Sequence, residues 1–147
     1  MERKDLIELM NEILCPLGFK HKGNNWLFNE AELSKIINLQ KSCFGNYYYI
    51  NYGFIIKAIK LDGLYMHIDN RLASKNREEQ KEIDTLLDFE FDMPKKRRLF
   101  LLKQKIELII LPVMQNVNSE EDIKNELKKR SHLNNIPLSV KKHFHLL

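Results

Sequence analysis

The sequence predicts an α+β fold, in which an antiparallel sheet of four or five strands has an N-terminal helix and long C-terminal helices packed on one face. Three observations lead to this prediction. Apolar residues recur at helical spacing near the N-terminus, two β-rich runs flank Gly45-Asn46, and a second helical pattern follows Pro94. With 147 residues, 30% of them charged and 44% hydrophobic, the chain matches one soluble globular domain, residues 1–147.

The first element expected is a helix over residues 3–14, because Leu6, Leu9 and Ile13 form a single apolar stripe. A short strand is expected at residues 26–28, where three apolar residues follow a Gly-Asn-Asn turn.

The strand pairing around Gly45-Asn46 follows from a two-residue type II′ turn, which needs a positive φ at its first residue. This turn sets Phe54 opposite Ile37 and Gly53 opposite Asn38. The same register places apolar side chains opposite apolar ones and amides opposite amides, and this agreement is good evidence for the register. The face predicted to be apolar carries Ile37, Leu39, Tyr52, Phe54, Ile56 and Ile68.

The next turn is expected to be a three-residue loop with Gly63 in the left-handed region. A two-residue loop would place Asp69 and Arg71 on the apolar face, and burying those charges is costly. The longer loop places Ile68 there instead and sets Arg71 beside Gly53.

The polar residues 74–84 predict a surface loop or a short solvated helix, followed by a last strand near residues 86–91. Pro94 then begins a long helix that Pro112 should kink, because proline cannot donate a backbone hydrogen bond. One face of this helix is expected to carry Leu99, Leu102, Ile106, Ile109 and Val113. Ser119 and Asp122 resemble a capping box that opens a helix to about Arg130, and residues 138–147 suggest a short final helix.

The second face of the predicted sheet is polar and is the candidate binding surface. It carries Asn38, Gln40, Ser42, Tyr49, Asn51, Gly53, His67, Asp69 and Arg71. Amides, aromatic rings and an arginine form an array of donors that suits a carboxylate, a phosphate or a partner protein. An ordinary solvated face of an antiparallel sheet is the alternative. Gly53, which has no side chain, is expected to leave room for Arg71 to lie across the sheet.

Basic residues concentrate in the last third of the chain. Residues 93–147 carry twelve Lys and Arg against five Asp and Glu, while the whole chain has a net charge of +4. The run Lys95, Lys96, Arg97 and Arg98 begins the long helix, where cations oppose the helix dipole. Contact with nucleic acid explains this run, and so does pairing with the acidic stretch 88–92 or a need for solubility.

Signals of catalysis and metal binding are sparse. His67 and Asp69 have the spacing of a base and its orienting group on one strand, with Arg71 as an anion clamp, but no nucleophile stands beside them. His143 and His145 have the spacing of a strand-borne metal pair without a companion cluster. The sequence holds no fingerprint for a cofactor, so we expect neither cofactor nor metal.

Three further features bear on location. The chain has no apolar run long enough to span a membrane. Its N-terminus is charged, unlike a secretory leader. Cys15 and Cys43 are too few for a disulfide framework, and we expect Cys43 to be a small buried side chain. A cytoplasmic protein that does not bind membranes is the expectation.

Several of these residues carry a resemblance to domain-of-unknown-function family 4304 over about residues 6–127. The matching segments are Leu17-Gly18-Phe19, Ile37–Ser42, Gly45-Asn46, Tyr49–Gly53, His67-Ile68, Arg71-Leu72 and Leu111-Pro112. The family places a second histidine two positions before the one that matches His67, and Tyr65 stands there in this chain. The resemblance implies a small bacterial cytoplasmic protein and brings no established activity.

The favoured function is therefore binding without catalysis, with the polar face recognising a partner protein or a small anionic ligand. Neutralisation of a toxin is one concrete form of this function. Nucleic-acid binding through the basic C-terminal helices is the first alternative, and an enzyme that uses His67 is the second.

Overall fold

The computed structural model describes all 147 residues and contains one antiparallel sheet of five strands in the order β1-β2-β3-β4-β5. The α+β prediction is confirmed. The strands are β1 (Lys20–Lys22), β2 (Asn25–Asn29), β3 (Leu33–Lys41), β4 (Tyr48–Ile56) and β5 (Ile68–Arg71). The strand expected at residues 26–28 is β2, and the three residues of β1 extend the sheet beyond it.

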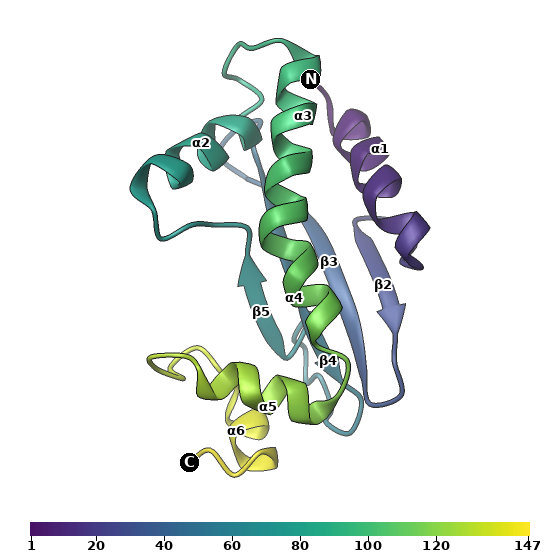
Figure 1. The fold of residues 1–147 in the computed structure, drawn as a ribbon, viewed down its shortest axis with the longest axis vertical. Coiled ribbons are helices and arrows are strands. Elements are labelled where there is room, and N and C mark those ends of the chain that lie inside the picture. The colour runs from purple at the N-terminus through teal and green to yellow at the C-terminus, as the bar shows by residue number, and fades with distance from the viewer.

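The helices form a layer on one face of the sheet. Figure 1 shows α1 (Arg3–Leu14) beside α3 (Lys95–Lys105), with α3 running on into α4 (Leu111–Asn116) across the strands. The other helices are α2 (Arg77–Leu87), α5 (Glu120–Lys128) and α6 (Leu138–His143), and α5 and α6 lie at the end of the sheet opposite to the start of α3. The expected helices after Ser119 and near the C-terminus are confirmed. Ser119 accepts a hydrogen bond from the backbone N–H of Asp122, as an N-cap does.

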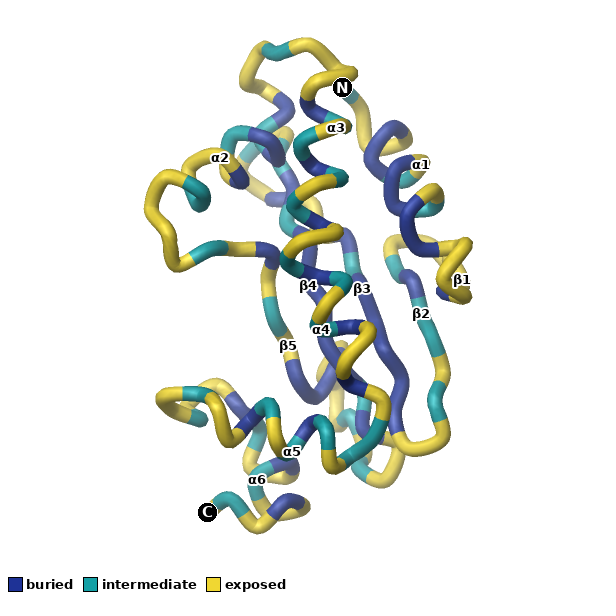
Figure 2. The backbone as a smooth tube through the Cα atoms, viewed as in Figure 1, coloured by how far each residue is buried: buried dark blue, intermediate teal, exposed yellow.

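The side chains of the sheet sort by face as the sequence predicts. The residues expected on the apolar face are all buried, and Figure 2 shows β3 and β4 as the most continuously buried strands. They pack in one hydrophobic core with α1, α2 and the α3–α4 helix. No helix of the structure combines the length and the apolar character needed to cross a membrane.

The predicted register between β3 and β4 is wrong by two residues. Ile37 pairs with Tyr52, and Asn38 pairs with Asn51 rather than with Gly53. A type II′ turn needs a positive φ at Gly45, and Gly45 does not have one. The connection is a four-residue loop instead, closed by a hydrogen bond from the Ser42 N–H to the carbonyl of Tyr47.

The register between β4 and β5 differs from the prediction by two residues as well. Arg71 pairs with Asn51, and Gly53 pairs with Asp69. Gly63 has the predicted left-handed backbone, with a φ of 87°, but the connection runs from residue 57 to residue 67 and is longer than three residues. The side chain of His67 holds this longer loop through the N–H of Ile56 and the carbonyl of Lys60.

The segment 74–91 is where the fold departs most from the prediction. Residues 77–87 form α2, whose Ile83, Leu86 and Leu87 enter the core. The strand expected near residues 86–91 is absent, and only an isolated bridge joins Asp88 to Tyr47. The short helix expected as one alternative for residues 74–84 is present, and most of its polar residues are exposed. It extends to Leu87, and its three buried residues lie at helical spacing, so α2 is an amphipathic helix that also packs on the core.

The long helix buries a different stripe from the predicted one. Arg98, Leu102, Ile106, Ile110 and Met114 are buried, whereas Leu99, Ile109 and Val113 are only partly so. The expected effect of Pro112 takes the form of a π-helical turn over Ile106–Ile110, in which the N–H of Leu111 bonds to the carbonyl of Ile106. The buried residues are four apart both before and after this turn, and the wider turn keeps Ile110 and Met114 on the buried side of the helix.

Candidate ligand-binding site

Asparagines form a straight row across the polar face. Asn25 of β2 pairs with Asn38 of β3, Asn38 pairs with Asn51 of β4, and Asn51 pairs with Arg71 of β5. Arg71 Nε donates to the side-chain oxygen of Asn51 at 3.1 Å, Asn51 donates to Asn38 at 3.2 Å, and Asn38 donates to Asn25 at 2.8 Å. Each group donates in the same direction, so the hydrogen bonds of the chain polarise one another.

Two neighbours of the row fix the guanidinium of Arg71. The side-chain oxygen of Gln40 accepts from Arg71 Nη2 at 3.0 Å and from Asn51 at 2.9 Å. The ring of Tyr49 lies beneath the guanidinium, with Cζ of Arg71 3.9 Å from the ring centroid. Arg71 is exposed and forms no ion pair, yet these contacts restrict its orientation. The arrangement is a cation of restricted orientation with N–H donors left over.

A cavity of about 390 Å³ adjoins Arg71, between the sheet and α2. Its floor is made of the buried side chains of Leu72, Ile83 and Leu87. Asp84 and Asp88 line the same cavity and form no ion pair. One carboxylate oxygen of Asp84 accepts from Gln80 at 2.8 Å and one of Asp88 accepts from the N–H of Glu90 at 3.0 Å, so each carboxylate keeps a second oxygen for a ligand. One cation and two anions therefore face a shared space without neutralising one another.

Two tyrosine hydroxyls lie at the edge of this cavity. The hydroxyl of Tyr49 donates to that of Tyr47 at 3.2 Å. Hydrogen bonding with Ser42, and then with Tyr49, lowers the pKa of Tyr47, while the bond to Tyr47 raises the pKa of Tyr49. Tyr49 therefore keeps its proton and remains a neutral ring beneath Arg71.

The expected gap at Gly53 is not there. A Cβ atom on Gly53 would lie 1.7 Å from the carbonyl oxygen of Ile68 and 2.8 Å from the sulfur of Met66, so β5 and the loop before it fill the space. Gly53 serves the close approach of two strands and gives Arg71 no room. Asp69, its partner on β5, is exposed, and desolvation raises its pKa against the opposing effect of Arg71.

His67 lies under the 57–67 loop and does not belong to the open surface. It is 2% exposed, its Nδ1 accepts from the N–H of Ile56 at 2.8 Å, and its Nε2 contacts the carbonyl of Lys60 at 3.0 Å. These partners require a neutral ring with its proton on Nε2. His67 fixes the loop and is not placed to pair with Asp69. Cys43 departs from prediction in the other direction, because it is exposed.

The four residues of the basic run at the start of α3 have different environments. Arg98 is buried and donates to the backbone carbonyls of Thr85, Leu86, Asp88 and Phe91. The ammonium of Lys95 pairs with the carboxylate of Asp5 at 2.8 Å. Lys96 and Arg97 are exposed. Figure 1 places this run at the opposite end of the molecule from α5 and α6, so the basic residues do not form one continuous surface.

The two C-terminal histidines have different environments as well. Nε2 of His143 lies 2.5 Å from a carboxylate oxygen of Glu120, while His145 stands past the end of α6 with a left-handed backbone. No group of three or more His, Cys, Asp or Glu side chains is placed to hold a metal ion.

Sequence reasoning found Arg71, Tyr49 and the amides but missed the opposite wall of the cavity. Asp84 and Asp88 belong to a segment expected to be a solvated loop or a strand. One signal was available, since Ile83, Leu86 and Leu87 have the spacing of a helical stripe. An expected helix with this stripe would have been packed with its apolar side against the sheet.

The comparisons with known proteins give one match. The family model described as a domain of unknown function, DUF4304, matches residues 10–116. No curated protein and no solved structure matches the chain. The matched range is more than half of the chain and contains the asparagine row, Arg71 and the whole lining of the adjoining cavity. The protein therefore belongs to the DUF4304 family of domains of unknown function.

Proposed function

We propose that the protein is a binding module without a catalytic role, and that it holds a small zwitterion of the amino-acid type in the cavity beside Arg71. The observation that carries the proposal is that Arg71, Asp84 and Asp88 line one cavity with an apolar floor and form no ion pairs. A carboxylate binds Arg71, an ammonium group binds the aspartates, and an apolar side chain covers Leu72, Ile83 and Leu87.

The charges of the lining favour a zwitterion over the plain anion expected from the polar face alone. A ligand with only a carboxylate would meet two aspartates across the cavity, and like charges repel. A ligand with only an ammonium would meet the fixed guanidinium. Orientation supports the same ligand, because Arg71 is held by Asn51, Gln40 and Tyr49 before any ligand arrives, which lowers the entropy lost on binding.

Binding is favoured over catalysis by the position of His67. Both of its ring nitrogens are engaged with backbone groups, so neither is free to take a proton from a substrate. The enzyme alternative loses the acid–base group on which it depended.

A partner protein, including a toxin that this protein would neutralise, is the second candidate. The observation in its favour is a pair of exposed aromatic rings, Phe44 at 90% and Phe91 at 53% exposure. Phe44 belongs to the loop after β3, which is tied to the segment of Phe91 by a hydrogen bond from the Phe89 N–H to the Asn46 carbonyl. Exposed aromatic groups are enriched at protein interfaces.

The test is calorimetric titration with leucine and two matched analogues. N-acetyl-leucine keeps only the carboxylate, and leucinamide keeps only the ammonium. We expect leucine to bind at least roughly tenfold more tightly than either analogue, since a charge-assisted hydrogen bond contributes about 1.5–3 kcal/mol. Arg71→Gln should abolish the advantage over leucinamide, and Asp84→Asn with Asp88→Asn should abolish the advantage over N-acetyl-leucine.

Arg77→Gln is the matched control, because Arg77 is an exposed arginine at the start of α2 outside the cavity lining. Equal binding of leucine and N-acetyl-leucine would contradict a role for the aspartates. Absence of binding by leucine and by the larger zwitterion phenylalanine would end the small-ligand proposal. The partner-protein candidate is tested separately, by comparing the proteins captured by wild type and by Phe44→Ser.

A further inference from the structure

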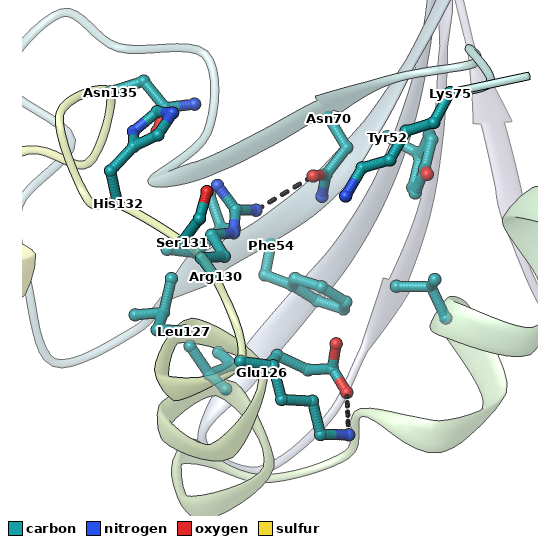
Figure 3. A pocket seen from close by; sticks show the side chains of 14 residues that line it. Tyr52, Phe54, Asn70, Lys75, Glu126, Leu127, Arg130, Ser131, His132 and Asn135 are labelled. Atoms are coloured by element: carbon teal, nitrogen blue, oxygen red, sulfur yellow. Dashed lines mark hydrogen bonds and ion pairs between the residues drawn. The ribbon is translucent and has the colours of Figure 1, made fainter.

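A second cavity, of about 520 Å³, lies between β4, β5, α4 and the segment 123–135. Figure 3 shows Asn70, Lys75 and Tyr52 along one rim, Arg130 facing Asn70, and Glu126 on the far side. The apolar part of the lining is Phe54, Ile68, Val113, Ile123 and Leu127. The volume is within the range of small-molecule sites.

Hydrogen-bond donors dominate one side of this cavity. Arg130 Nη2 donates to the side-chain oxygen of Asn70 at 2.9 Å, which turns the amide nitrogen of Asn70 to other partners. Lys75 lines the cavity without any hydrogen bond or ion pair of its own. The hydroxyl of Tyr52 has no protein partner either, although the residue is only 7% exposed. Desolvation raises the pKa of Tyr52, so at neutral pH the hydroxyl is a donor.

The acceptors are fewer and are already engaged. The carboxylate of Glu126 lies 3.2 Å from the ammonium of Lys129, which balances that pair. The positive charges of Lys75 and Arg130 are left without a counter-charge, beside a buried aromatic and aliphatic floor. A site of this composition is complementary to an anion attached to an apolar body.

We propose that this cavity binds a small amphipathic anion, in which a carboxylate or sulfonate contacts Arg130, Lys75 and Tyr52 and an aromatic or aliphatic body covers Phe54 and Leu127. This site is separate from the one beside Arg71. It is built in part from residues 123–135, beyond the range that the family model matches.

The test uses two fluorescent probes of similar shape. Anilinonaphthalene sulfonate carries the anionic group, and N-phenylnaphthylamine lacks it. We expect the sulfonate to bind wild type and to be displaced by octanoate. Lys75→Gln and Tyr52→Phe should each weaken the sulfonate by roughly tenfold, the effect of losing one charge-assisted hydrogen bond, and leave N-phenylnaphthylamine unchanged. Lys75 has no structural partner, so its replacement leaves the fold intact.

Lys142→Gln is the control for charge alone, since Lys142 is exposed on α6 outside the cavity. An equal effect of Lys142→Gln and Lys75→Gln on the sulfonate would overturn the proposal. Equal affinity of wild type for the two probes would do so too, because the anion would then contribute nothing. Displacement by phosphatidylglycerol vesicles but not by octanoate would overturn binding of a free amphiphile in favour of a lipid surface.

Discussion

Replacing Arg98 by methionine is expected to lower the free energy of unfolding by about 3–5 kcal/mol. Arg98 is 2% exposed, and its guanidinium donates at 2.9, 2.7 and 3.0 Å to the carbonyls of Thr85, Leu86 and Asp88, and also to that of Phe91. Methionine fills much of the same space, so the cost comes from the carbonyls that lose their donor. Hydrogen bonds to a charged group contribute about 1.5–3 kcal/mol each, but they do not add fully.

The desolvation of Arg98 offsets part of that gain. Desolvation lowers the pKa of Arg98, and its Nε is buried without a partner. These terms reduce the expected loss to the range measured when one partner of a buried charged interaction is removed. Because native domains have total stabilities of about 5–15 kcal/mol, the variant should unfold at much lower denaturant.

Urea unfolding followed by circular dichroism measures this loss, with Arg97→Met as the matched control. Arg97 is exposed one position away, and its replacement should change the stability by no more than about 0.5 kcal/mol. Arg98→Lys should be intermediate, since one ammonium cannot serve carbonyls spread over residues 85–91. Equal losses for Arg98→Met and Arg97→Met would refute the structural role and return the whole basic run to the surface.

Three further predictions address the sheet, the N-terminus and the basic residues. Phe54→Ala in the core is expected to cost roughly 3 kcal/mol of unfolding free energy. Gly53→Ala should cost more, because the new Cβ would lie 1.7 Å from the carbonyl oxygen of Ile68. Gly45→Ala is the control in the same urea experiment, since its Cβ would have no neighbour closer than 3.4 Å. The hydrogen bonds of Asp5 with Lys95 and with the Glu2 N–H hold the pKa of Asp5 below its ordinary 3.8, so its contribution to stability is present above that pH and is lost as the pH falls through the lower folded value. The stability difference between wild type and Asp5→Asn should therefore shrink in acid, and a constant difference would contradict the ion pair. Fluorescence anisotropy with DNA and RNA should show no binding that falls steeply with salt, since Arg98 and Lys95 are engaged within the protein and the start of α3 lies at the opposite end of the molecule from α5 and α6. A slope of several log units of affinity per log unit of salt would contradict this division.

The faces of the sheet could be predicted from the sequence, although the partners across it could not. Both registers were wrong by two residues, and the side-chain period of a strand is also two, so the strand residues stay on their predicted faces. His67 is the exception, because it precedes β5 and is covered by the 57–67 loop. Asn51 therefore lies on the polar face as expected but opposite Asn38, which is what completes the row to Arg71. The loop lengths depend on contacts that turn propensity does not contain, such as the bond from the Phe89 N–H to Asn46.

The packing of the helices could not be predicted fully from the sequence either, for a different reason. Apolar residues occupy two sides of the 95–116 segment, so periodicity alone did not decide between the stripe with Leu99 and the stripe with Arg98. A buried arginine is rare unless its donors are satisfied, and here the acceptors are carbonyls at the end of α2. A separate error removed α2 from the expected core, because the polar residues 74–84 were assigned to a solvated segment and residues 86–91 to a strand. That error also hid Asp84, Asp88 and the cavity that they line.

The two candidate sites share strands and are nevertheless chemically separate. On β4, Asn51 belongs to the polar row while Tyr52 lines the larger cavity, and on β5 Arg71 and Asn70 divide in the same way. Alternation along a strand places consecutive residues on opposite faces. The cavity beside Arg71 also reaches the helical side through Leu72 and α2, but the two cavities share no lining residue. One site matches two opposite charges, and the other leaves positive charge uncompensated. Because they differ in chemistry and share no lining residue, a substitution at Arg71 serves as a control for the cavity of Asn70, and a substitution at Lys75 serves as a control for the cavity of Arg71.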